Sequence, residues 1–151
     1  MGEKPFVVLL AEDNQDDIVA TQRAWKKNNI ANPLYIVNDG EECLDYLHQR
    51  GKYADPASAP HPGILLLDIK MPKMDGLAVL KHVREDEGLH RLPVIILTTS
   101  KAEEDRAKGY DLHVNAYIQK PVGFNNFSEA VKAINLFWEL VELPEWSNGH
   151  K

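Results

Sequence analysis

The segment LLLDIKMPKMDG, residues 65–76, decides how the chain folds. It opens on an unbroken apolar run and meets its first charge at Asp68. Strands that are covered on both faces read as continuous apolar runs, and such strands occur in parallel sheets with helices above and below. Asp75 is a preferred helix N-cap residue, and apolar residues follow it at helical spacing. The segment therefore predicts a buried parallel strand, a short loop and a helix.

The rest of the chain repeats this strand-then-helix pattern. Four more apolar runs are typical of strands, at residues 6–11, 34–37, 94–97 and 114–118. Amphipathic segments that are typical of helices follow them, at residues 14–29, 40–51, 101–110 and 127–141. Residues 52–63, rich in Pro and Ala, are expected to form an ordered surface excursion. We predict one α/β domain with a doubly wound, five-stranded parallel sheet of order 2-1-3-4-5, the flavodoxin-like (βα)5 arrangement.

The composition fits a soluble globular protein. The chain has 151 residues, of which 44% are hydrophobic and 26% are charged, and this suits one domain. A net charge of −6 disfavours direct binding to nucleic acid, because neutralising phosphates needs a basic face. The single cysteine excludes a disulfide framework, and no apolar stretch is long enough to span a membrane. Because the N-terminus lacks a signal-peptide pattern, we expect a cytoplasmic protein.

Polar residues follow four of the predicted strands at the points where these strands end. Glu12 and Asp13 follow the first strand, Asp68 the third, Thr98 the fourth and Lys120 the fifth. The carboxyl ends of parallel strands meet at one edge of the sheet, so we expect these side chains to converge. Three carboxylates at close range repel one another, and a set of oxygen ligands suits a hard cation such as Mg²⁺. The sequence therefore predicts a magnesium site beside a fixed lysine charge.

Asp68 is the candidate nucleophile of this site. A carboxylate that is held rigidly at the centre of the sheet can bind a metal and can also attack phosphorus, which gives an aspartyl phosphate. The metal would shield the nucleophile from the anionic phosphoryl group, while Lys120 and the Thr98 hydroxyl would contact the remaining phosphoryl oxygens. Positioning and charge stabilisation are most of what phosphoryl transfer requires.

Four stretches in order resemble the receiver domains of two-component response regulators, the CheY-like superfamily. They are LLAEDN (9–14), LLLDIKMPKMDG (65–76), PVIILTTS (93–100) and AYIQKPV (116–122). The resemblance covers residues 5–142 and leaves 143–151 as a C-terminal tail. It implies a single-domain regulator that accepts a phosphoryl group from a sensor histidine kinase and engages a partner protein. Such a domain catalyses only its own phosphorylation and dephosphorylation.

The resemblance also implies a role for each residue that matches the family pattern. Asp68 would be the phosphoacceptor, and Lys120 would bind the phosphoryl group. The ligands of Mg²⁺ would be Glu12, Asp13, Asp68 and the backbone carbonyl of Lys70.

Thr98 and Tyr117 would form the switch pair of such a domain. The Thr98 hydroxyl would be drawn towards a phosphoryl oxygen, and the Tyr117 ring would turn into the vacated space. This movement would change the surface formed by the fourth helix, the fifth strand and the fifth helix.

Within this family the chain is most similar to stand-alone regulators that are paired with bacterial phytochrome kinases. RAWKKNNIANPLYIVNDGEECLDYL (23–47), VNAYIQKPV (114–122) and the FW…LP ending (137–144) carry this likeness. It implies a phytochrome-type sensor kinase as the partner. One departure is Lys70, because many receivers carry a neutral or smaller side chain there. We hypothesise that its ammonium slows dephosphorylation.

Three other functions match parts of the pattern. A haloacid-dehalogenase-like phosphatase needs a second acid two residues after its nucleophile, where this chain has Lys70. A flavodoxin-like FMN binder needs a phosphate-binding loop after the first strand, where Glu12 and Asp13 would repel phosphate. A non-phosphorylated pseudo-receiver would lack one of the five site residues, and none is missing. Each of these residues alone also has an ordinary explanation, such as an acid at a helix start or a threonine in a strand.

The last predicted helix carries more apolar surface than a monomer needs. A second apolar face lies beside its core stripe and consists of Leu136, Phe137, Leu140 and Leu143. Either the tail folds back over this face or a second copy of the chain covers it. We expect a homodimer through this helix and its neighbours.

The remaining metal-binding residue types carry no pattern in the sequence. The histidines are scattered, at positions His48, His61, His82, His90, His113 and His150. No pair of them stands at helical spacing with a carboxylate, so the sequence indicates no metal or phosphohistidine role. Cys43 is expected to pack as a small hydrophobic residue.

Overall fold

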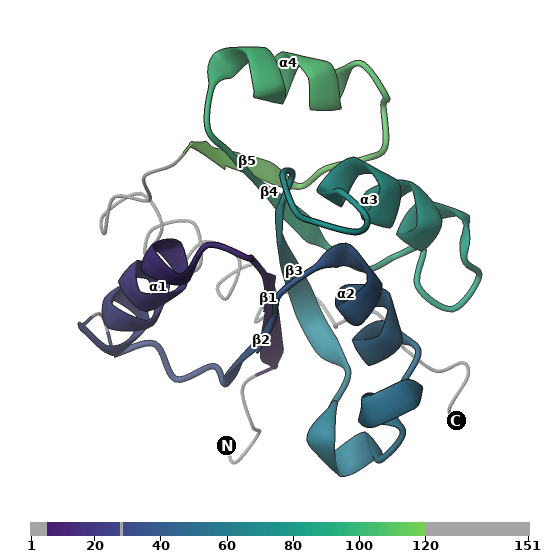
Figure 1. Cartoon of the computed structure of the whole chain (residues 1–151). Helices are drawn as coiled ribbons and strands as arrows, with labels where there is room; N and C mark the ends of the chain where they lie inside the picture. Colours follow the sequence, from purple (N-terminus) through teal and green to yellow (C-terminus); the bar gives the residue numbers. More distant parts are fainter. Residues whose placement is uncertain (1–5, 28, 120–151) are drawn as a thin grey trace, which may run out of the picture.

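The sheet has the predicted topology. In the computed structural model, which describes residues 6–27 and 29–119, five strands form a sheet of order β2-β1-β3-β4-β5, and every neighbouring pair is parallel (Figure 1). The strands are β1 (Val7–Ala11), β2 (Leu34–Val37), β3 (Pro62–Asp68), β4 (Val94–Thr98) and β5 (Ala116–Gln119). The doubly wound α/β fold with strand order 2-1-3-4-5 is confirmed.

The helices begin where the capping residues of the sequence predict. Within the described residues they are α1 (Gln15–Lys27), α2 (Gly40–Leu47), α3 (Gly76–Glu85) and α4 (Lys101–Lys108). A side-chain oxygen of Asp75 accepts the Ala78 N–H at 2.9 Å, and Asp39 accepts the N–H of Glu42 at 2.7 Å. Each such bond satisfies a backbone N–H that the first turn of a helix leaves unpaired.

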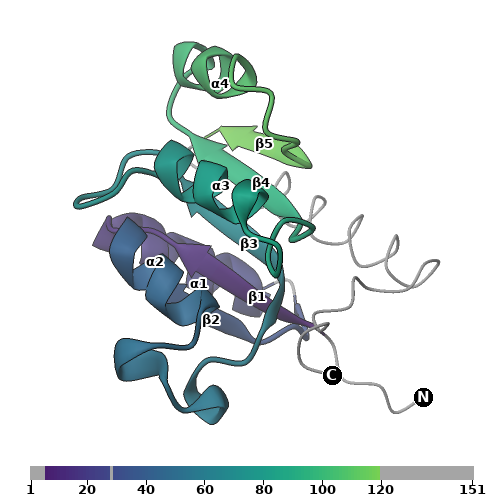
Figure 2. The same cartoon turned by 90° about the vertical axis from the view of Figure 1, so that its right-hand side faces the viewer.

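Alternate residues of the central strands face two separate hydrophobic cores. Leu65 and Ile96 pack with buried residues of α2 and α3, whereas Leu66 and Ile95 pack with Trp25 of α1. Figures 1 and 2 show the same layers, with α1 on one face of the sheet and α2 and α3 side by side on the other. Every residue of β3 is buried, which explains its continuous apolar sequence.

Several element boundaries differ from the prediction. The second helix ends at Leu47 and not near Gly51, because Gln49 and Gly51 adopt positive φ angles of 53° and 61°, which an α-helix cannot contain. The expected excursion consists of two short 3₁₀ turns, Gly51–Tyr53 and Pro56–Ser58, and β3 already begins at Pro62. The fifth strand covers Ala116–Gln119, whereas the apolar run predicted 114–118.

Some predictions fall on residues outside the described ranges. They concern Lys120 and the last helix with its apolar face, and they stay predictions. Within the described residues, no helix is both long and apolar enough to cross a membrane. Cys43 is fully buried as expected, and burial raises the pKa of its thiol.

Candidate functional site

Three carboxylates meet at the carboxyl edge of the sheet. Ala11 of β1 pairs with Leu67 of β3, so Glu12 and Asp68 follow at adjacent strand ends. Glu12 is 1% exposed and Asp68 is 2% exposed, while the neighbouring Asp13 is open to solvent. One carboxylate oxygen from each of the three residues lies within 4.8 Å of the others. The structure thus brings together the three acids that the sequence places at the ends of two strands.

Backbone contacts fix the position of Glu12. Its N–H donates to the Val37 carbonyl at 3.0 Å, and its own carbonyl accepts the Asn38 side-chain amide at 3.2 Å. Its carboxylate oxygen Oε2 accepts the Asn14 N–H at 3.1 Å. The backbone of Glu12 is therefore held by β2 and the residue after it, and its carboxylate by the entry into α1.

The donor set fits a divalent cation. It consists of carboxylate oxygens only, two of them on nearly fully buried residues, and burial of like charges is costly without a compensating positive charge. Hard cations such as Mg²⁺ and Mn²⁺ prefer these oxygen ligands. Lys120, the predicted positive partner, lies outside the described residues.

Thr98 of the predicted switch pair lies on β4, which neighbours the strand of Asp68, and Tyr117 lies on β5, on the far side of β4. Asp68 pairs with Leu97, so Thr98 stands one residue further along β4, and it is fully buried. Among the described residues its Oγ1 has no hydrogen-bond partner. Tyr117 lies opposite Ile96 on β5, is partly exposed, and has the Lys108 ammonium 5.3 Å from its ring centroid. Burial raises the pKa of Tyr117, against the opposing effect of that ammonium.

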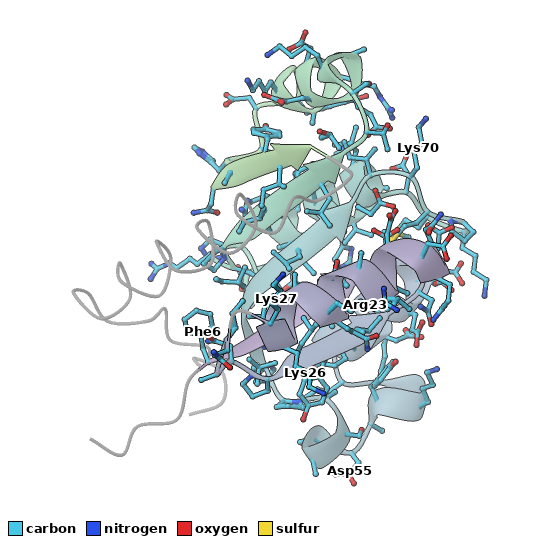
Figure 3. The ribbon with its side chains drawn as sticks, turned by 90° about the vertical axis from the view of Figure 1, so that its left-hand side faces the viewer. Phe6, Arg23, Lys26, Lys27, Asp55 and Lys70 are labelled. Atoms are coloured by element: carbon cyan, nitrogen blue, oxygen red, sulfur yellow. The ribbon has the colours of Figure 1, made fainter. Side chains whose placement is uncertain are left out.

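Lys70 stands at the border of the site, two residues after Asp68. Its side chain is 71% exposed, and Figure 3 shows it at the end of the sheet remote from Phe6. Its Nζ lies 3.5 Å from Oε2 of Glu103, a buried residue in the first turn of α4. Glu103 is not among the site residues that the sequence predicts. The signal was present, because Glu103 stands three residues after the N-cap Ser100.

A cavity adjoins the carboxylates on the side of the β3–α3 loop. Its volume is about 470 Å³. Arg106 of α4 and Asp75, the N-cap residue of α3, line it from two sides and form an ion pair at 3.6 Å. The other lining residues are Asp13, Ile69, Lys70, Met71 and Pro72. The cavity thus gives a small polar molecule or a partner side chain access to the open side of the acidic site.

Comparison with known proteins agrees with this geometry. Residues 8–132 match the response regulator receiver domain family. Response regulator Rcp1 of Synechocystis sp. is 38% identical over 141 residues, which are 93% of this chain and 94% of Rcp1. A solved structure of Rcp1 in its Mn²⁺-bound form has a TM-score of 0.74, with 38% identity over 93% of this chain and all of that one.

Two further solved structures extend the likeness. The bacteriophytochrome response regulator RtBRR has a TM-score of 0.82 and 38% identity over 95% of this chain and 87% of its own. The phosphorylated cyanobacterial phytochrome response regulator RcpA has a TM-score of 0.75 and 39% identity over 93% of this chain and 99% of its own. The family match, the sheet order and the acidic edge lead to one conclusion: the chain belongs to the response regulator receiver domain family and is related to the regulators of phytochrome pathways.

Proposed function

We propose that the chain accepts a phosphoryl group on Asp68 from a phosphohistidine of a sensor kinase. The observation that carries this proposal is the cluster of Glu12, Asp13 and Asp68 oxygens within 4.8 Å at the carboxyl edge of the sheet. Asp68 ends β3, a strand whose residues are all buried, and β3 pairs with a neighbouring strand on each side. The receiver domain would extend over residues 5–142, with 143–151 as a tail.

The transfer exchanges one bond for another. A carboxylate oxygen of Asp68 forms a bond to phosphorus as the bond from phosphorus to the histidine nitrogen breaks, and the imidazole leaves with the electron pair. The ligands of Mg²⁺ would be Glu12, Asp13, Asp68 and the Lys70 carbonyl. When bound, Mg²⁺ would offset the negative charge that gathers on the phosphoryl oxygens. The chain would in this way catalyse its own phosphorylation and the hydrolysis of its aspartyl phosphate, and it would turn over no external substrate.

Thr98 is suited to respond to the presence of a phosphoryl group on Asp68. Its buried hydroxyl has no partner among the described residues, so it gains a hydrogen bond when an anionic oxygen appears beside it. Movement of Thr98 would open space beside β5 for the Tyr117 ring. Turning inwards takes this ring away from Lys108, which also pairs with Glu104 of α4 at 2.7 Å. The surface of α4 and β5 would therefore change on phosphorylation, with Lys120 holding the phosphoryl group.

The partner that this likeness favours is a phytochrome-type histidine kinase in the cytoplasm. Its support is the similarity to the phytochrome response regulators over nearly the whole chain. We also propose that two copies pair through the last predicted helix, whose second apolar face includes Leu140. In light scattering, the wild type should have the molar mass of a dimer and Leu140→Asp that of a monomer. A monomeric wild type rules this pairing out.

Incubation with acetyl phosphate and Mg²⁺, followed by intact mass, tests the assignment of Asp68. The wild type should gain one phosphoryl group and Asp68→Asn should gain none. Asp16→Asn, which changes an exposed carboxylate of α1, should be phosphorylated like the wild type. Absence of any gain in the Mg²⁺-loaded wild type would instead indicate a pseudo-receiver that works as a binding module.

A further inference from the structure

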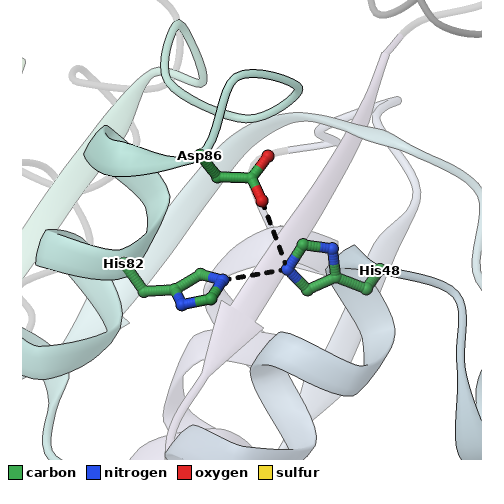
Figure 4. Close-up of side chains that lie close together, drawn as sticks. All are labelled: His48, His82 and Asp86. Atoms are coloured by element: carbon green, nitrogen blue, oxygen red, sulfur yellow. Dashed lines mark hydrogen bonds and ion pairs between the residues drawn. The ribbon is translucent and has the colours of Figure 1, made fainter.

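Two histidines and an aspartate that are scattered in the sequence converge on the α2–α3 side of the molecule. His48 is the C-cap residue of α2, His82 lies in the last turns of α3, and Asp86 is the C-cap residue of α3. His48 and His82 are 34 positions apart in the chain, yet their Nε2 atoms are 2.9 Å apart. Oδ2 of Asp86 lies 3.7 Å from Nε2 of His48 (Figure 4). The fold therefore brings together residues that are scattered along the sequence.

The spacing of these atoms suits one small transition-metal ion. One ligand atom from each of the three residues lies within 4.8 Å of the other two. Zinc binds imidazole nitrogen at about 2.0–2.1 Å in tetrahedral sites, which places two nitrogen ligands about 3.3 Å apart. The two observed separations, 2.9 Å and 3.7 Å, bracket this value. Small side-chain rotations would be enough to bring the three ligands around an ion.

The surroundings orient the ligands for such an ion. Oδ1 of Asp86 accepts the Gly88 N–H at 2.8 Å, which turns Oδ2 towards His48. A hydrogen bond to the outer oxygen of a carboxylate is the usual support of a metal ligand. Both helices end here, so their partial negative charges favour a cation and disfavour an unneutralised carboxylate.

Partial burial leaves the imidazole of His48 available as a ligand. Burial lowers the pKa of His48, which favours the neutral imidazole that binds metals. Asp86 and Asp45 oppose this shift, whereas Arg50 and His82 add to it. The Arg50 guanidinium is itself paired with Asp45 at 2.9 Å, which reduces its repulsion of a bound cation.

The cluster is reachable from solvent and separate from the acidic edge. The side chains of His48 and Asp86 are 25% and 28% exposed, which leaves room for a water molecule or another ligand on the metal. A helix of a strand–helix unit runs opposite to its strands, so the C-terminal ends of α2 and α3 lie at the amino edge of the sheet. Glu12, Asp13 and Asp68 lie at the carboxyl edge.

We propose that His48, His82 and Asp86 form a second metal site, selective for a borderline-soft divalent ion of the Zn²⁺ class. Imidazole ligands favour Zn²⁺ over Mg²⁺, which prefers oxygen ligands only. An ion at this position bridges α2 and α3 and stabilises their packing on the sheet.

Isothermal titration calorimetry of the full-length, tag-free chain with Zn²⁺ tests this site. The protein is first stripped of metal and then saturated with Mg²⁺, so that the acidic edge is occupied. We expect one Zn²⁺ per wild-type chain. His48→Gln, His82→Gln and Asp86→Asn should each weaken binding at least about tenfold, because each removes one of three ligands. His113→Gln, which removes an exposed histidine, should bind Zn²⁺ like the wild type.

Thermal unfolding gives a second readout and controls for folding. Zn²⁺ should raise the unfolding temperature of the wild type and of His113→Gln, but not that of Asp86→Asn, whose side chain keeps its size. Absence of Zn²⁺ binding by the wild type overturns the proposal. Undiminished binding by both His48→Gln and His82→Gln overturns it as well, because the ion would then occupy other ligands.

Discussion

Lys70 Nζ lies 3.5 Å from Oε2 of Glu103, and this ion pair ties the loop after the candidate phosphoacceptor to the first turn of α4. Glu103 is 6% exposed, and its other oxygen, Oε1, accepts the Thr99 N–H at 2.8 Å. One buried carboxylate therefore holds both the residue after Thr98 and the side chain two positions after Asp68. A phosphoryl group on Asp68 would compete with Glu103 for the same ammonium.

Removal of the Lys70 charge should shorten the lifetime of the aspartyl phosphate. Near the phosphoryl group the ammonium attracts anionic oxygens and hinders the approach of water, an effect of about 1 kcal/mol or about fivefold in rate. The half-life of phosphorylated Lys70→Asn should accordingly be about fivefold shorter than that of the wild type. Lys73→Asn, which changes an exposed lysine of the same loop paired with Asp39, is the matched control. An equal or shorter half-life of the wild type would refute the hypothesis.

Gly76 allows the start of α3 to lie directly on the backbone of Asp68. A β-carbon at this position would overlap the Asp68 carbonyl oxygen and the Ile69 backbone, which cannot move without shifting the end of β3. Gly76→Ala should therefore cost about 1–3 kcal/mol in urea unfolding and also slow phosphorylation by acetyl phosphate. Gly88→Ala is the control, since the nearest atom to its added carbon would be an aspartate oxygen at 3.4 Å. Equal stability of the two variants would contradict this reading.

Arg84 joins two loops through four backbone carbonyls. Its guanidinium donates to the carbonyl oxygens of His90, Leu92, Leu112 and His113 at 2.6–3.0 Å. Arg84→Met keeps the aliphatic stem but leaves these acceptors without the donor, so we expect a loss of at least about 2 kcal/mol in urea unfolding. Arg50→Met removes an exposed ion pair with Asp45 and should cost less than about 1 kcal/mol. Similar losses in both variants would show that the four carbonyls find other partners.

The carboxylate of Glu42 makes the free energy of unfolding depend on pH. Burial alone would raise the pKa of its carboxyl, but a hydrogen bond from the Tyr53 hydroxyl, another from the Asn38 N–H and the Lys52 ammonium together lower it. Because the folded-state pKa lies below the ordinary value of 4.5, Glu42 stabilises the fold fully above pH 4.5. This contribution is lost as the pH falls through the folded-state pKa.

The matched pair Glu42→Gln and Glu41→Gln isolates this effect. We expect the urea midpoint of Glu42→Gln to fall less than that of the wild type between neutral and acid pH. Glu41 is an exposed neighbour, so Glu41→Gln should follow the wild type at every pH. An identical pH profile of all three proteins would mean that the contacts of Glu42 do not favour its ionised form.

Much of the fold and of the acidic site was predictable from the sequence. The apolar run before Asp68 is continuous because β3 is buried on both faces. The start of α3 is predictable because Asp75 is a residue type that caps helix N-termini, and its side chain accepts the Ala78 N–H. Element ends were less predictable. The C-terminal end of α2 depends on the positive φ angles of Gln49 and Gly51, and the sequence marks only the glycine.

The sequence by itself determined the strand order and the meeting of Glu12, Asp13 and Asp68, because residues that end parallel strands must share one edge of the sheet. Tertiary structure alone decided that Lys70 pairs with Glu103 and that His48 meets His82 and Asp86. These contacts depend on how the helices pack across the sheet and on which rotamers that packing allows. Neither property is encoded in the spacing of residues along the chain.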